Sequence, residues 1–204
     1  MHITWLGSTA LKIQTKPGEQ DITIIIDPYK QETGTTPRSL APNIAIISDT
    51  KKETFTLSGE PFIFNSPGEI ETKGVLITAA LGHDPEKIII RIDSENMSIA
   101  HLGITNKQLT NEQLDIVNGV DILCLPVGGG EGYDADQAVK TVNSIEPRII
   151  IPLGFKSDNE PTAADVSTFL KAIGLKADEP EKKVILRKKD LPQEDTQIIV
   201  LAKE

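Results

Sequence analysis

The fold is decided by two short segments, ITWLGSTA at residues 3–10 and IIDP at residues 25–28. In the first segment an apolar run is interrupted by Gly7-Ser8 and then resumes, which predicts two strands joined by a tight turn. In the second segment a run of isoleucines ends at Asp27-Pro28, where proline stops a third strand. Pro17-Gly18 supplies a turn before that strand, so the chain is expected to begin as an antiparallel sheet.

The rest of the chain divides into a strand-rich part and a part in which helices and strands alternate. Further strands are expected at 44–47, 61–64, 74–78, 87–92, 97–100, 122–125, 148–151, 184–186 and 198–201, and the polar stretch 29–42 is expected to be a loop. Capping-box patterns at Thr110 and Asp134 predict two helices, and a third is expected from Thr162 to a stop at Gly174. This order leaves an α+β and a mixed α/β fold open, and two face-to-face sheets with outer helices would satisfy it.

Composition limits the class of protein and its partners. The chain has 204 residues, of which 38% are hydrophobic, and carries a net charge of -9. An acidic surface argues against nucleic acid or an anionic membrane as the main partner. The single cysteine, Cys124, lies in an apolar run and is expected in the core, which fits a reducing compartment. No signal peptide or membrane-spanning stretch is visible, so a cytoplasmic protein is expected.

Several segments, in order and spacing, resemble the metallo-β-lactamase superfamily, in particular its small single-domain metal-dependent hydrolases related to ascorbate-phosphate lactonases. Besides the two segments above, the resemblance is carried by Gly59-Glu60-Pro61, Gly68-Glu69, Gly74-Val75, His101-Leu102-Gly103, residues 125–129, Asp134-Ala135 and residues 146–152. It implies an α+β fold, the αββα four-layer sandwich, with two packed mixed sheets in one domain over residues 1–204. It also implies metal ligands on loops at one edge of the sheets, where zinc would activate water.

Most positions that the resemblance assigns to metal ligands hold other residues. The family's His-x-His-x-Asp-His motif falls on residues 49–54, and its final histidine and bridging aspartate fall elsewhere in the chain. The residues at these positions are Asp49, Lys51, Glu53, Thr54, Ile104 and Gly154, with Ser8 in place of a further histidine and His83-Asp84 kept as a His-Asp pair. The chain has three histidines, too few for the family's imidazole ligands. No zinc or other cofactor is therefore expected.

The first functional hypothesis is a catalytically degenerate member of this fold with a binding or assembly role. Its partner would be a small molecule or a protein, a homo-oligomer is expected, and Lys51 and Lys52 could hold a small anion. The alternative is a hydrolase of ester, lactone or phosphoester bonds with an altered carboxylate/His site for Zn²⁺, Mn²⁺ or Mg²⁺. That site would draw on His83 and on oxygen ligands from Asp49, Glu53, Asp84 and Asp134, although Asp134 also reads as a helix cap.

A third hypothesis, a metal-free enzyme, needs a nucleophile and a base that the sequence does not reveal. Residues 128–132, GGGEG, lack the Lys-Ser/Thr ending of a phosphate-binding loop and are expected to form a strand-to-helix turn. His101 is expected to hold the framework through hydrogen bonds, and Asp27 to fix a turn. Burial is expected to keep Cys124 from acting as a nucleophile.

Overall fold

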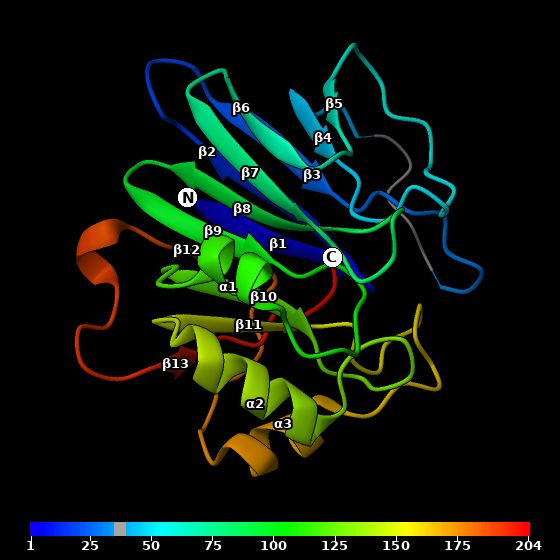
Figure 1. Cartoon of the computed structure of the whole chain (residues 1–204), viewed down its shortest axis with the longest axis vertical. Helices are drawn as coiled ribbons and strands as arrows, with labels where there is room; N and C mark the ends of the chain where they lie inside the picture. Colours follow the sequence, from blue (N-terminus) through cyan, green and yellow to red (C-terminus); the bar gives the residue numbers. More distant parts are fainter. Residues whose placement is uncertain (35–39) are drawn as a thin grey trace.

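The computed structural model describes residues 1–34 and 40–204, so the expected loop over 29–42 lies partly outside the described residues. Two sheets pack face to face (Figure 1). In spatial order, the first sheet contains β12 (Val184–Ile185), β1 (His2–Gly7), β2 (Ala10–Thr15), β3 (Ile22–Ile26), β4 (Ile44–Ile46) and β5 (Phe62–Phe64). The second contains β13 (Gln197–Ile198), β11 (Ile149–Leu153), β10 (Ile122–Pro126), β9 (Met97–His101), β8 (Ile88–Ser94), β7 (Val75–Leu81) and β6 (Gly68–Thr72).

Both sheets are mixed. In the first, the strands from β12 to β3 pair antiparallel, whereas β3, β4 and β5 run parallel. In the second, β13, β11, β10 and β9 run parallel, and the strands from β9 to β6 alternate in direction. The expected α+β fold with two packed mixed sheets is confirmed.

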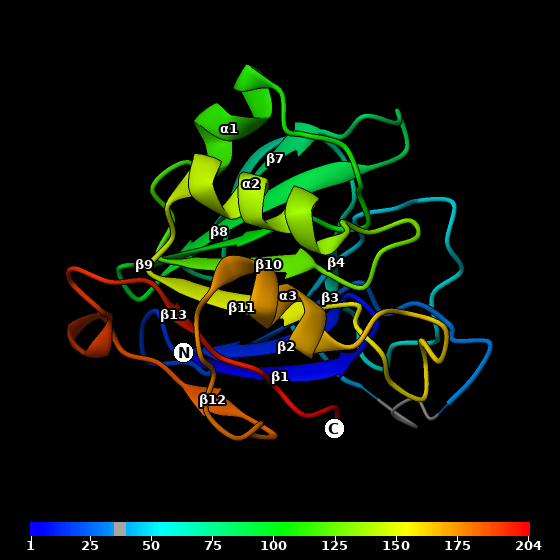
Figure 2. The same cartoon turned by 90° about the horizontal axis from the view of Figure 1, so that it is seen from below.

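The helices pack on the seven-stranded sheet and on one another (Figure 2). They are α1 (Asn111–Val117), α2 (Ala135–Ile145) and α3 (Val166–Ile173), and a short 3₁₀ helix covers Lys188–Asp190. Both expected capping boxes are present, because the side chains of Thr110 and Asp134 accept from the backbone of the residue three positions on. Gly174 ends α3 with a φ of 73°, in the left-handed region where glycine is favoured. In the described part of the chain, no helix is long and apolar enough to cross a membrane.

Some expected boundaries were wrong, and one strand was not expected. Helix α3 begins at Val166 and not near Thr162, because the backbone N–H of Ala164 donates to the Gly128 carbonyl and the Asp165 side chain supplies the cap. The last expected strand shortens to Gln197–Ile198: Ile199 still donates to the Ile150 carbonyl of β11, and the chain then forms an isolated bridge from Leu201 to Glu181. Strand β6 was not predicted, because as an edge strand it is mostly exposed and carries little apolar alternation.

A continuous apolar core joins the inner faces of the two sheets. Its members include Ile3, Trp5, Ile13 and Ile24 from the first sheet and Ile77, Ile90, Ile99 and Cys124 from the second. Trp5 also packs against Phe155, with ring centroids 4.4 Å apart. Burial raises the pKa of the Cys124 thiol, which keeps it protonated and unreactive, as the sequence indicated.

Candidate functional site

The loops that follow β1, β3, β4, β7, β9, β10 and β11 all emerge at one edge of the two sheets. The strand directions require this, because β1 and β3 both run antiparallel to β2, β3 and β4 are parallel, and β7 shares the direction of β9, β10 and β11. Backbone hydrogen bonds join the two sheets there, from Ile88 to the Ser48 carbonyl and from Gly154 to the Ser8 carbonyl, each 2.9 Å long. The edge therefore collects Ser8, Asp27, Asp49, His83, Asp84, Ile104, Gly128 and Gly154.

Asp49 is the best buried of the predicted site carboxylates, with 4% of its surface exposed. Its Oδ1 accepts the Lys51 backbone N–H at 3.0 Å, and its backbone N–H donates to the Tyr29 hydroxyl at 2.6 Å. Its Oδ2 lies 3.9 Å from the Lys87 ammonium. Asp49 is thus held by the protein itself and faces a lysine.

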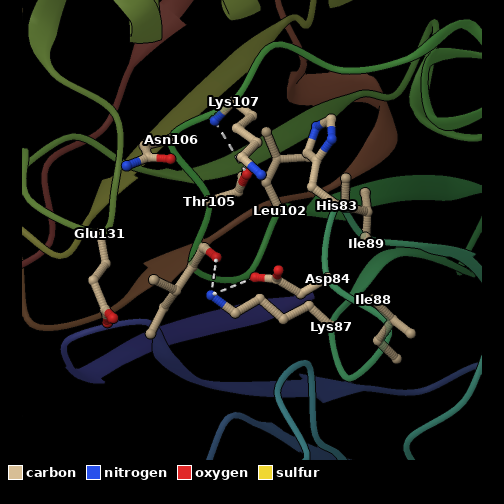
Figure 3. Close-up of a pocket in the computed structure, with 12 residues that line it drawn as sticks. His83, Asp84, Lys87, Ile88, Ile89, Leu102, Thr105, Asn106, Lys107 and Glu131 are labelled. Atoms are coloured by element: carbon tan, nitrogen blue, oxygen red, sulfur yellow. Dashed lines mark hydrogen bonds and ion pairs between the residues drawn. The ribbon is translucent and has the colours of Figure 1, made fainter.

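Lys87 is the residue around which this edge is organised, and sequence reasoning did not single it out. Its ammonium donates to the Ile104 carbonyl at 3.3 Å and lies 3.7 Å from Asp84 Oδ2 (Figure 3). The Lys87 ammonium thus lies among Asp49, Asp84 and the carbonyl of Ile104, the residue at the family's bridging-aspartate position. The two carboxylates thus share one cation that belongs to the chain.

His83 and Asp84 line a cavity of about 160 Å³, here called the Lys87 cavity, together with Lys87, Ile104 and Glu131. The His83 ring points away from the Lys87–Asp84 pair (Figure 3), and its buried Nε2 has no hydrogen-bond partner among the described residues. The His-Asp pair of the sequence is therefore split, with only Asp84 directed at the ammonium.

The lysines and glutamate of residues 49–54 pair with charged residues outside this segment. Lys51 pairs with Glu86 at 3.1 Å, and that carboxylate raises the Lys51 pKa through its hydrogen bond and charge. Glu53 pairs with Lys30 at 2.8 Å, which lowers the Glu53 pKa. Lys52 lies 3.5 Å from Glu131. Because each of the three has a partner of opposite charge on the surface, none is directed toward Asp49.

Ile104 and Gly154 lie on a second cavity, of about 250 Å³, that adjoins the first. This Ser8 cavity is lined by Ser8, Thr9, Lys52, Ile104, Pro126, the glycine-rich loop 128–132, Gly154, Glu160, Thr162 and Ala163. The glycine-rich loop forms the turn between β10 and α2, as expected, with φ values of 76° at Gly129 and 66° at Gly130. Ser8 and Glu160 meet in this cavity, with the Ser8 hydroxyl 2.7 Å from Glu160 Oε1.

Behind these cavities, Asp27 anchors the edge. It is fully buried, and its carboxylate accepts the Ser48 backbone N–H and hydroxyl, each at 2.8 Å, and the Thr9 hydroxyl at 2.9 Å. Burial, assisted by the charge of Asp27, raises the Tyr29 pKa, so that hydroxyl stays protonated. His101 is also buried. Its Nε2 is hydrogen-bonded to the Thr9 carbonyl, and its Nδ1 accepts the Gly103 N–H. Asp27 and His101 therefore hold the backbone of this edge in place through hydrogen bonds.

The donor set at this edge does not fit the zinc centre that the resemblance implies. A zinc site needs at least three protein ligands in a fixed geometry. Across residues 1–34 and 40–204, no three His, Cys, Asp or Glu side chains form a group that could hold a metal ion. Asp134 caps α2, Glu53 pairs with Lys30, and the ammonium of Lys87 lies between Asp49 and Asp84. Of the oxygen ligands considered from the sequence, Asp49 and Asp84 share a neighbour, and that neighbour is the Lys87 ammonium.

Replacing Lys87 by methionine is expected to lower the free energy of unfolding by about 1–2 kcal/mol, between the values of exposed and buried ion pairs. The apolar stem is retained, while Asp49, whose side chain is 5% exposed, loses its balancing charge. Urea unfolding followed by Trp5 fluorescence measures the loss. Lys51→Met removes the exposed pair with Glu86 and is the matched control. Equal stability of the two variants would contradict the role assigned to Lys87.

Comparison with known proteins identifies the family and the fold of the chain. Residues 2–154 match the model of the beta-lactamase superfamily domain. A metal-dependent hydrolase of Staphylothermus marinus is 31% identical over 96 residues, which are 47% of this chain and 41% of that protein. The chain thus spans less than half the length of such curated relatives.

Solved structures share the two-sheet fold of this chain. A Thermotoga maritima protein assigned to the Zn-dependent hydrolases of the metallo-β-lactamase superfamily superposes with a TM-score of 0.82 at 22% identity, covering 99% of this chain and 100% of that one. Igni18, a metallo hydrolase of Ignicoccus hospitalis, superposes with a TM-score of 0.62 at 16% identity over 85% of this chain and 90% of its own. On these matches and its two-sheet frame, the chain belongs to the beta-lactamase superfamily and has the metallo-β-lactamase fold.

Proposed function

We propose that this protein uses the metallo-β-lactamase fold without the zinc chemistry of its family, and that its edge cavities bind a small molecule. The observation that carries the proposal is the Lys87 ammonium, which lies among Asp49, Asp84 and the Ile104 carbonyl. A divalent cation beside these carboxylates would be repelled by the ammonium at short range.

The Ser8 cavity supports a small polar ligand without net charge. Its charged lining residues are one lysine, Lys52, and two glutamates, Glu131 and Glu160, a slight negative excess that disfavours an anion. The anion expected beside Lys51 and Lys52 would compete with Glu86 and Glu131, which already pair with those lysines. Hydroxyl groups of Ser8 and Thr162 and the backbone of residues 128–132 offer donors and acceptors for an uncharged molecule.

A homo-oligomer and a cytoplasmic location accompany this proposal as predictions. The free, buried Cys124 supports a reducing compartment. Light scattering of the purified chain measures the oligomeric state, and a mass equal to one chain would remove the homo-oligomer from the proposal.

The alternative is a metal-dependent hydrolase with an altered site, which the family and the names of its relatives favour. It would use Asp49, Asp84 and His83 after a rearrangement that withdraws Lys87. The two functions predict different metal contents, so a single measurement separates them.

Purified without a histidine tag, incubated with Zn²⁺, Mn²⁺, Fe²⁺ or Mg²⁺ and desalted, the protein is expected to retain less than about a tenth of an equivalent of any metal. Elemental mass spectrometry measures the content. The variants Asp49→Ala and His83→Ala, treated in parallel, are expected to give the same background. A stoichiometric metal in the natural sequence that is lost in either variant would establish the alternative and overturn the proposal.

A further inference from the structure

We propose that Ser8 and Glu160 form a nucleophile and base pair that cleaves small uncharged acyl esters without a metal. The inference goes beyond ligand binding and rests on the proposed metal independence of the edge. It supplies the nucleophile and base that a metal-free enzyme would need. The pair escaped sequence reasoning because the two residues are 152 positions apart and belong to no common motif.

Contact and access are the first requirement for such a pair, and both are met. The Ser8 hydroxyl donates to Glu160 Oε1 at 2.7 Å, a distance suited to proton transfer between a nucleophile and its base. Ser8 is 6% exposed, so little bulk water competes for its hydroxyl, yet it lines the cavity of about 250 Å³ together with Glu160. A small ester in that cavity would meet both side chains.

The backbone at Ser8 is strained and held in place. Its φ of 46° lies in the left-handed region, which costs a residue other than glycine of order 1–3 kcal/mol. Two hydrogen bonds hold the Ser8 carbonyl, from Trp5 Nε1 at 2.8 Å and from the Gly154 N–H at 2.9 Å. Strain that the surroundings maintain in this way is typical of residues presented for chemistry.

The loop that carries Glu160 reaches Ser8 because residue 7 is glycine. A Cβ at Gly7 would lie 2.1 Å from the Asn159 side-chain oxygen, and Gly7 adopts a φ of 108°. Asn159 is itself anchored, since its amide donates to the Thr33 carbonyl. The missing side chain at position 7 therefore lets the loop of residues 158–160 lie against the end of β1 and bring Glu160 to the serine.

A positive charge is available for the oxyanion that such a reaction forms. Lys52 lines the cavity with Ser8, and its partner Glu131 is 3.5 Å away with 74% of its side chain exposed. An exposed pair of this length is weak, so the ammonium can turn to a negative charge that develops inside the cavity.

The reaction has two balanced steps. In the first, Ser8 Oγ forms a bond to the carbonyl carbon of the ester while Glu160 takes the hydroxyl proton. The bond to the leaving oxygen breaks, and the alcohol departs with that proton. In the second, Glu160 removes a proton from a water molecule, whose oxygen attacks the acyl group on Ser8. The acid is released and Ser8 recovers its proton.

The test uses the full chain after treatment with a chelator and desalting, with metal content measured on the same sample. The protein is incubated with p-nitrophenyl acetate and, separately, with a fluorophosphonate, and covalent adducts are located by peptide mass spectrometry. One adduct on Ser8 and release of p-nitrophenol are expected. Ser8→Ala is expected to abolish both, and Glu160→Gln to lower the rate of p-nitrophenol release at least ~100-fold.

Ser144→Ala is the matched control, because that serine lies on α2 and donates only within its own helix. It is expected to react like the natural sequence, and circular dichroism checks that every variant is folded. The absence of an adduct on Ser8 in folded, metal-free protein overturns this inference alone. A stoichiometric metal in untreated protein overturns the proposed function, whatever the probes show, so the two failures are distinguishable.

Discussion

Replacing Asp27 by alanine is expected to destabilise the protein by about 4 kcal/mol, because unpaired buried donors cost about 1–3 kcal/mol each. Asp27 is fully buried, and its carboxylate accepts three hydrogen bonds, two from Ser48 and one from Thr9. Alanine removes the carboxylate from all three donors; the Ser48 hydroxyl also lies 3.4 Å from the Tyr29 hydroxyl. It also places a residue poorly suited to the left-handed region at a φ of 54°, where aspartate and asparagine are tolerated.

Asp27→Asn is the matched control for the charge and the backbone. Asparagine keeps the shape and the left-handed conformation, and its oxygen can accept the Ser48 N–H, so its loss is expected to be about half that of alanine. Urea unfolding followed by the fluorescence of Trp5 measures both. A loss below about 1 kcal/mol for alanine would mean that this network does not hold the edge together.

Gly128→Ala is expected to cost about 3 kcal/mol, at the upper end of what overpacking costs. An added Cβ would lie 2.0 Å from the Gly154 carbonyl oxygen, which is backbone and cannot rotate away. The turns after β10 and β11 would have to separate, and these turns form one wall of the Ser8 cavity. The substitution should therefore loosen the cavity as well as destabilise the fold.

Alanine substitutions at two other glycines distinguish a steric clash from backbone strain as the cause of the lost stability. Gly18 has open space around it and no left-handed φ, so alanine there is expected to change the stability by less than about 0.5 kcal/mol. Gly129 has open space but a φ of 76°, so alanine there should cost about 1 kcal/mol through the backbone alone. Urea unfolding of the three variants measures the order. If Gly128→Ala were no worse than Gly129→Ala, the close contact with Gly154 would not limit the packing.

Local sequence signals were sufficient for much of the fold. The capping boxes at Thr110 and Asp134 and the stop at Gly174 depend on residues a few positions apart, and the structure has all three. Short apolar runs likewise located the strands of the core. The start of α3 was missed because it depends on a bond from Ala164 to Gly128, which are distant in the chain.

The chemistry of the edge depends almost entirely on such distant contacts. The sequence indicated that the ligand positions had changed, but not that Lys87 would lie between Asp49 and Asp84. It also gave no sign that Lys52 would pair with Glu131 or that Ser8 would meet Glu160. Charge partners and nucleophile–base pairs assembled from separate loops leave no spacing pattern for sequence reasoning to detect.

The ammonium of Lys87 differs from a bound metal in how it is supplied. A zinc ion must be taken up, competed for and retained, whereas a lysine is present in every molecule as soon as it is translated. The balance of charge around Asp49 and Asp84 therefore does not change when a cell is starved of metal. Chelators, which unfold proteins stabilised by a metal, have nothing to withdraw from this pair. Under the proposed function, the state of this edge would therefore not depend on the supply of metal in the cell.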